Sequence, residues 1–369
     1  MSRAKRATLE FDPLYGKLQD GLSAVLQIGR SLWVANDETT RLELLSLTSS
    51  TEADPLRWGE HQSLSLEDYF ELPSPADDAG ETEEADIEGL AYSSETKYLW
   101  LVGSHSLKRK KASPDRPLAR NMERLADISA DGNRFLLARI PLRQEDGLHL
   151  PAGNSAEDGR VAARLHGDTT GSDLTAALED DEHLGPFLSI PGKDNGFDIE
   201  GLAVAGNRLF VGLRGPVLRG WAVVLEIEPE VVPDAADELR LREIGAGGRR
   251  YRKHFLDLGG LGIRDLCVQG DDLLILAGPT MDLDGPVSLY RWPRGAIPEG
   301  ESLLFGEQLE KLFDVDFGEG DDHAEGLCLL QLEATAVPRL LIVYDAASAA
   351  RKPTPASVEV DVFPWPTPH

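Results

Sequence analysis

A short motif, Asp-Ile-Glu-Gly-Leu-Ala, constrains the fold of this chain more than any other feature because it recurs. It occupies residues 86–91 and 198–203, and Ala-Glu-Gly-Leu-Cys at 324–328 is a third copy. Residues 262–267 and 22–25 are degenerate copies. Each copy precedes a short apolar run, and the aligned leucines of these runs are Leu32, Leu99, Leu209, Leu273 and Leu340. Five copies of one unit indicate an architecture built from equivalent supersecondary repeats.

Each repeat predicts four β-strands. The motif and the apolar run are the first two, and runs rich in aromatic and β-branched residues, such as 221–227 and 254–258, supply the others. The fourth strand of the second repeat is expected at 186–190, whereas the last repeat lacks one, and residues 8–12 would fill that place. We therefore predict an all-β protein, a β-propeller of about five four-stranded blades, closed by the N-terminal strand pairing in the C-terminal blade.

The spacing of the repeats predicts insertions. The equivalent positions Ser23, Glu88, Glu200, Arg264 and Glu325 are 65, 112, 64 and 61 residues apart, which exceeds the ~40–45 residues of a minimal blade. We expect residues 1–369 to form a single propeller domain with insertions at about 106–132 and 143–185. The second insertion predicts a short surface helix over 172–179, with Ser172 as its N-cap. A degenerate sixth blade within the long interval is the alternative.

Composition excludes several classes of partner. A formal net charge of −27 repels nucleic acid and anionic membranes, so we expect neither as a partner. The basic start Met1–Arg6 is followed by Leu9–Asp12 and not by an apolar run, and no stretch of ~18 apolar residues follows. The sequence therefore predicts a cytoplasmic protein.

Candidate functional residues stand at the start of each first strand and in the loop after each second strand. In a propeller the innermost strands run along the central channel, so these positions are expected to meet at one mouth of it. The candidates are Asp37, Asp86, Glu88, Ser104, His105, Asp198, Glu200, Arg214, Arg219, Arg264, His323 and Glu325.

The carboxylates among them suggest metal binding and catalysis. Carboxylates from separate blades can together hold Ca²⁺ or Mg²⁺, and Glu88, Glu200 and Glu325 are the candidate ligands. Repulsion between like charges would also raise the pKa of one carboxylate. Glu88 and Glu200, with His105, are therefore candidate catalytic acids or bases. The structural alternative is that each glutamate accepts backbone N–H bonds from the neighbouring blade, with the following glycine allowing a tight turn.

The arginines suggest recognition of an anion. Arg264 replaces the glutamate of three other repeats, and Arg214 and Arg219 lie in an expected loop, 212–220. A guanidinium binds a carboxylate or phosphate through two hydrogen bonds. Further expected contacts to such a ligand are Asp37, Asp86, Ser104, Asp198 and His323. The alternative for Arg264 is an ion pair with a glutamate of another blade. The basic run 108–111 is expected over the same face, as an anion-binding or merely solvated loop.

Taken together, these segments resemble a bacterial family catalogued as domain of unknown function 3616, over nearly the whole chain. The segments that carry the resemblance are 86–90, 104–106, 198–202, 212–222, 262–266, 277–280, 282–286 and 323–327. That family implies no established activity. Through the acidic-Glu-Gly motif alone, the chain is also similar to propellers of the phytase-like esterase type, which implies Ca²⁺-dependent action on phosphate esters.

Three functions are consistent with these features. The first is a binding protein whose channel mouth holds a small polar or anionic ligand, or a peptide from a partner protein. The second is a metal-assisted hydrolase of a phosphate ester, ester or lactone, in which Arg214 or Arg264 binds the anionic group and His105 or a glutamate moves the proton. The third is a protein-interaction scaffold. Because no nucleophile and base recur at a recognisable spacing, the sequence favours binding.

Overall fold

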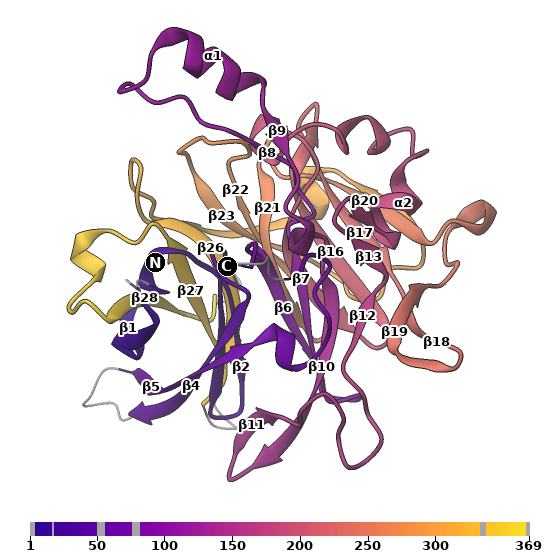
Figure 1. Cartoon of the computed structure of the whole chain (residues 1–369). Coiled ribbons are helices and arrows are strands. Elements are labelled where there is room, and N and C mark those ends of the chain that lie inside the picture. The colour runs from indigo at the N-terminus through magenta and orange to yellow at the C-terminus, as the bar shows by residue number, and fades with distance from the viewer. Residues whose placement is uncertain (1–3, 17, 50–55, 76–81, 333–336, 367–369) are drawn as a thin grey trace.

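The chain folds into antiparallel β-sheets arranged around a centre (Figure 1). The structure is a computed structural model that describes residues 4–16, 18–49, 56–75, 82–332 and 337–366. Residues 1–3 of the basic N-terminal stretch lie outside these ranges. Within them the two α-helices are short, α1 (Leu118–Ala126) and α2 (Asp173–Leu178), and no helix is long and apolar enough to cross a membrane. The protein is therefore all-β, as predicted.

Five four-stranded antiparallel units account for most of the strands. The first contains β2 (Leu22–Ile28), β3 (Ser31–Asn36), β4 (Arg41–Ser49) and β5 (Arg57–Ser65). The second contains β6 (Ile87–Ser93), β7 (Tyr98–Gly103), β10 (Leu137–Glu145) and β12 (Ala163–Leu165). The third contains β15 (Asp198–Ala205), β16 (Arg208–Leu218), β17 (Trp221–Ile227) and β20 (Tyr251–Asp257). The fourth contains β21 (Gly262–Gln269), β22 (Asp272–Gly278), β23 (Val287–Trp292) and β25 (Glu310–Val315).

The fifth unit joins the two ends of the chain. It contains β26 (His323–Leu330), β27 (Arg339–Asp345), β28 (Ser357–Pro364) and β1 (Lys5–Glu10). β1 pairs with β28 in antiparallel register, and Thr8 and Leu9 also pair in parallel with β5 of the first unit. The N-terminal strand β1 therefore belongs to the same sheet as β28, the last strand of the chain.

The hydrophobic core is divided into five clusters, each between two successive units. Alternate residues of one strand serve two different clusters, as β3 illustrates. Leu32 and Val34 pack towards the fifth unit, while Trp33 and Ala35 pack towards the second. Because both faces of such a strand are covered, its sequence is a continuous apolar run and lacks the polar alternation of a half-exposed sheet. Sheets that pack face to face in sequence order give a β-propeller-like arrangement.

The structure corrects two expectations about strands and adds one strand that was not predicted. Residues 186–190 form no strand: the short 3₁₀ helix η5 (Gly185–Phe187) lies there, with Pro186 in its first turn, where the missing N–H of proline is tolerated. The sequence analysis did not identify β12, which takes that place beside β10. Residues 212–220 are not a loop, since β16 continues to Leu218.

The two insertions are placed as follows. Residues 106–132 contain β8 (Lys108–Arg109), α1 and β9 (Ile128–Ser129), which together form an arm that projects from the body of the molecule (Figure 1). Residues 143–185 contain α2, which Ser172 caps as predicted by accepting from Thr175 N. They also contain β11 (Leu148–Pro151), β13 (Gly167–Asp168) and β14 (Gly171–Ser172). Leu174 and Leu178 are buried in the cluster between the second and third units, so this helix is part of the core.

A further hairpin was not anticipated. Between β17 and β20 the chain forms β18 (Pro229–Val232) and β19 (Ala235–Leu241), and β19 pairs in parallel with β12. The hairpin therefore extends the sheet of the second unit with residues that come from the third. On the other side of the third unit, β24 (Ser302–Leu304) pairs in parallel with β20 as an edge strand.

Candidate functional site

Each innermost strand carries a β-bulge at the same position of the repeat. The pairing between first and second strands skips one residue in every unit, and these residues are Ser23, Glu88, Glu200, Arg264 and Glu325. A bulge leaves its extra residue unpaired and redirects its side chain, and bulges are frequent beside active sites. The equivalent positions inferred from the repeats therefore share one local backbone geometry.

The glycine after the glutamate is required by close packing between units. A Cβ atom on Gly89 would lie 2.6 Å from Leu202 Cβ, and one on Gly326 would lie 3.0 Å from Val25 N. Neither glycine has a positive φ. The innermost strands β6 and β15, and likewise β26 and β2, approach too closely here for a side chain. The sequence suggested that this glycine allows a tight turn, but in the structure it allows a close contact between strands.

Arg264 binds two of the repeat glutamates. Its Nη1 donates to Glu200 Oε2 at 3.0 Å and to Glu325 Oε1 at 2.7 Å, and its Nη2 donates to the carbonyl oxygen of Pro279 at 3.0 Å. Arg214 Nη1 donates to the other oxygen of Glu200 at 2.5 Å. All these side chains are largely buried. Of the two interpretations of Arg264, the ion pair between units is the one present.

This geometry bears on the metal site expected from Glu88, Glu200 and Glu325. The Arg264 guanidinium already lies between Glu200 and Glu325, where a shared cation would bind. Among the described residues, no three His, Cys, Asp or Glu side chains are arranged to hold a metal ion. Because an arginine cation occupies the space, these three glutamates do not fit Ca²⁺ or Mg²⁺ as a ligand set.

Glu88 differs from the other two glutamates because it has no hydrogen bond or ion pair with any described residue. Burial raises its pKa well above the usual value, and the negative charges of Asp86, Glu200 and Glu325 add to the effect. Glu325 also has a raised pKa, for which burial is the main cause and the charge of Glu200 a further one. Glu88 is therefore a carboxyl group without a partner among the described residues, and its pKa is well above the usual range.

Two aspartates extend this acid-rich region. Asp37 Oδ1 is buried without a hydrogen-bond partner, and burial together with the charges of Asp345 and Asp86 raises the pKa of Asp37 to about 8. Burial, with the charge of Glu200, raises the pKa of Asp198 to about 7. A cation that approaches such a buried carboxyl group stabilises its charged form.

Asp86 is held by an arginine that the sequence analysis did not select. Arg134 Nη1 lies 2.8 Å from Asp86 Oδ2, and the same guanidinium binds Glu84 and the hydroxyl of Ser106. Arg134 lies in the 3₁₀ helix η4 (Gly132–Phe135). It belongs to no repeated motif, so only the fold could show its proximity to Asp86.

His105 is buried and conformationally strained. Its φ is +54°, its Nδ1 lies 2.9 Å from the carbonyl oxygen of Gly103, and its Nε2 has no partner among the described residues. Because a carbonyl oxygen only accepts, Nδ1 carries the proton and Nε2 is a free acceptor. Burial lowers the pKa of His105 to about 4, so the ring is neutral. Ser104, beside it, hydrogen-bonds to Ser106 at 3.0 Å.

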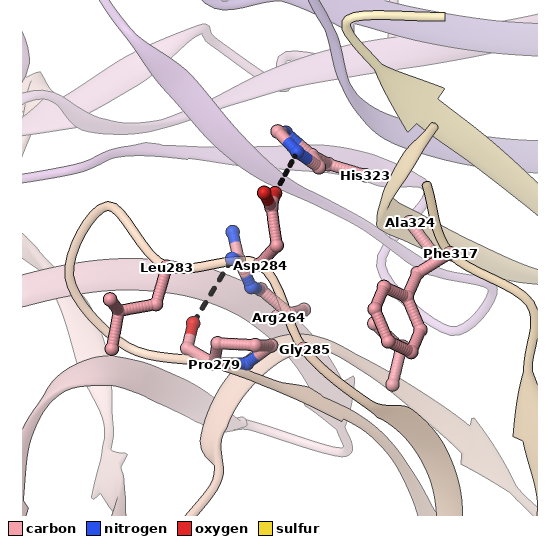
Figure 2. A pocket seen from close by; sticks show the side chains of 9 residues that line it. Arg264, Pro279, Leu283, Asp284, Gly285, Phe317, His323 and Ala324 are labelled. Atoms are coloured by element: carbon pink, nitrogen blue, oxygen red, sulfur yellow. Dashed lines mark hydrogen bonds and ion pairs between the residues drawn. The ribbon is translucent and has the colours of Figure 1, made fainter. Parts of the chain in front are cut away.

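His323 lies at a separate pocket next to Arg264 (Figure 2). Its Nε2 is 2.9 Å from Asp284 Oδ1, and Phe317 and Leu283 line opposite sides of the pocket. Arg264 lines this pocket and also contacts the glutamates, so the pocket adjoins the acid-rich region. Arg219, in contrast, is exposed in the turn between β16 and β17 and has no ion pair with a described residue.

The basic run 108–111 is already paired with acidic side chains of the body and of the arm itself. Lys108 pairs with Glu84 and Asp131, Arg109 Nε lies 2.7 Å from Asp194 Oδ2, and Lys110 pairs with Asp127. Lys111 Nζ lies 3.0 Å from Asp282 Oδ2, in the loop after β22. Since each of these cations has an acidic partner, the run does not present free charge to an anionic ligand.

The fold and this site define a β-propeller-like protein with a buried, acid-rich cluster where its innermost strands begin. More particularly, the chain belongs to the family described as protein of unknown function (DUF3616), whose model matches residues 21–361. No curated protein matches it.

Solved structures give only distant likenesses. A putative oxidoreductase (glucose dehydrogenase) from Thermus thermophilus has 15% identity and a TM-score of 0.37, with 98% of this chain and 100% of that chain covered. A putative 6-phosphogluconolactonase from Bacteroides uniformis has 12% identity and a TM-score of 0.32, with coverages of 92% and 65%. Hydrazine synthase from Kuenenia stuttgartiensis has 6% identity and a TM-score of 0.33, with 91% of this chain and 59% of that chain covered. The chain spans less than two thirds of the last two, and these scores assign no activity to it.

Proposed function

We propose that the acid-rich region binds a small polar ligand carrying an ammonium or guanidinium group, either free or as a basic side chain of a partner peptide. The observation that carries this proposal is the unpaired state of Glu88. Arg214 and Arg264, which the sequence analysis assigned to an anionic ligand, are engaged by Glu200 and Glu325. Glu88 and Asp37 Oδ1 are acidic and lack a hydrogen-bond partner, and a cation that approaches them stabilises their charged forms, so the region favours a cation over an anion.

The test is a calorimetric titration with agmatine, which carries an ammonium and a guanidinium group, and with inorganic phosphate. Agmatine should bind and phosphate should not. Binding should release protons, because a cation favours the charged form of Glu88 and Asp37. Proton release is measured by repeating the titration in buffers of different ionisation enthalpy.

Matched variants separate the site from general charge effects. Glu88→Gln and Asp37→Asn should each weaken agmatine binding at least tenfold, whereas Glu67→Gln, an exposed acid, should leave it unchanged. Equal weakening by all three variants, or saturable binding of phosphate in place of agmatine, would contradict the proposal.

Hydrolysis is the second candidate, and the raised pKa of Glu88 favours it. A carboxyl group with a raised pKa suits general acid catalysis, and the free Nε2 of His105 suits a base. The glutamate set does not fit a metal, so no metal-dependent step is proposed. Phosphate esters, carboxylic esters and lactones should be screened with and without Ca²⁺. Turnover that disappears in folded Glu88→Gln protein would support hydrolysis, and its persistence there would exclude Glu88.

We also infer that the five four-stranded units are the blades of one closed ring. The innermost strands pack against one another in the order β2, β6, β15, β21, β26 and back to β2, and β1 pairs with β28. A cytoplasmic location remains a prediction. A pure scaffold role would be favoured if neither agmatine nor any ester is bound.

A further inference from the structure

Helix α1 exposes an apolar face that nothing in the described chain covers. Leu118, Met122 and Leu125 follow a helical spacing that places them on one side, and their exposed fractions are 78%, 61% and 45%. The helix has no buried residue and stands clear of the body (Figure 1). A helix of nine residues is marginally stable without packing. Its apolar face is therefore typical of a contact surface.

The base of the arm holds this helix in place. β8 and β9 pair with each other, and the ion pairs of Lys108, Arg109 and Lys111 fix the arm to Glu84, Asp194 and Asp282. These polar contacts hold the arm in its projecting position, and folding the arm back onto the body would break them.

The same chain carries a patch of complementary chemistry at the edge strand β24. Leu303 and Phe305 have exposed fractions of 54% and 51%, and Phe305 packs edge-on against Trp221. Glu299 and Glu307, on either side along the chain, are exposed and acidic. On the arm, Arg116 and Arg120 are exposed and basic, and Arg120 also pairs with Glu123 one turn along the helix. Apolar centres with opposite charges around them favour association.

We propose that α1 of one copy docks on the β24 edge of a second copy. Leu118 and Met122 cover Leu303 and Phe305, and Arg116 and Arg120 face the glutamates that flank the patch. Because the two surfaces differ, the assembly is either a two-fold exchange of arms, whose interface is isologous, or a ring or chain of heterologous contacts.

Light scattering after size-exclusion chromatography tests this, with full-length protein over a range of concentrations at 0.15 M salt. The wild type should be a dimer or larger. Leu118→Ser with Met122→Ser, and separately Leu303→Ser with Phe305→Ser, should each raise the dissociation constant at least tenfold. Leu14→Ser, which removes an equally exposed leucine elsewhere, is the matched control and should leave assembly unchanged.

A charge exchange tests the orientation. Arg120→Glu alone should weaken assembly, and combining it with Glu307→Arg should restore it. Circular dichroism confirms that each variant is folded. A wild type that is monomeric at every concentration overturns the proposal. So does assembly that survives in either double variant, since both surfaces are required.

Discussion

Arg264 illustrates how one residue can replace a ligand. It stands where three other repeats have glutamate, and its Nη1 donates to two of those glutamates, Glu200 and Glu325. A buried carboxylate is costly unless it is paired, so the arginine supplies inside the protein the positive charge that a bound cation would otherwise bring. The same substitution makes the region asymmetric, because Glu88 is left without such a partner.

Replacing Arg264 with leucine should reduce the free energy of unfolding by about 3–5 kcal/mol, because Glu200 and Glu325 would remain buried with less compensation. Chemical denaturation measures the change. Arg219→Leu is the control, since an exposed arginine without an ion pair should change stability by no more than about 0.5 kcal/mol. A loss below about 1 kcal/mol for the Arg264 variant would show that the ion pairs contribute little.

The aspartates predict a pH dependence of stability. The pKa values of Asp37 and Asp198 are raised to about 8 and about 7 in the folded protein, while both are near 3.9 in the unfolded chain. The folded state therefore binds more protons, and this stabilisation is lost as pH rises from about 4 through 8. Stability should be lower at pH 8.5 than at pH 6. The difference should shrink in Asp37→Asn, and an unchanged difference would argue against Asp37 as its source.

Among the strand elements, the bulged innermost strands connect the repeat pattern to the fold. The bulge leaves the same position of the repeat unpaired in all five units, and the next position packs against the neighbouring inner strand. In the fourth unit that next position is Asp265, whose Oδ2 accepts from Leu327 N at 2.7 Å in β26. The aspartate thus makes the link between units that the sequence analysis considered for the glutamates.

Gly89→Ala should destabilise the protein by about 1–3 kcal/mol, because the added methyl group would overlap Leu202 in β15. Gly300→Ala is the matched control. No atom lies within 4 Å of a Cβ at that position and its φ is not positive, so the expected change is small. Thermal unfolding compares the two, and equal effects would refute the packing argument.

Most strands could be predicted because their apolar runs indicate burial directly, and β17 has the expected bounds, 221–227. The failures share a physical cause. Strand β12 has only three residues and pairs across a long insertion, while the strand-like segment 186–190 begins inside the 3₁₀ helix η5. For the site, repetition identified Glu88, Glu200, Arg264 and Glu325, but the pairing of Asp86 with Arg134 depends on a segment outside the repeats.

For the whole molecule, stability comes from five interfaces between neighbouring units in place of one central core. The cluster between the fifth and first units contains Leu9 of β1 together with Val25 and Val358. A residue near the N-terminus is therefore as deeply buried as those of the central repeats.

Leu9→Ala should accordingly cost about 2–5 kcal/mol of the free energy of unfolding, as expected for a fully buried leucine. Leu14→Ala, five residues further along and 88% exposed, should have almost no effect. Urea denaturation followed by tryptophan fluorescence measures both, because Trp58 lies in the same cluster. A tolerated change at Leu9 would mean that β1 is dispensable for the fold.

The pairing of β1 with β28 also sets an order of events during synthesis. Leu9 pairs with Val358, so at 5–20 residues per second the ribosome needs roughly 20 to 70 s to deliver the partner after the leucine has been made. Until then the strand 5–10 has neither its antiparallel neighbour nor the apolar cover of the fifth unit. The first strand to be translated is thus among the last to gain its antiparallel neighbour, and only the short parallel pairing of Thr8 and Leu9 with β5 is available to it earlier.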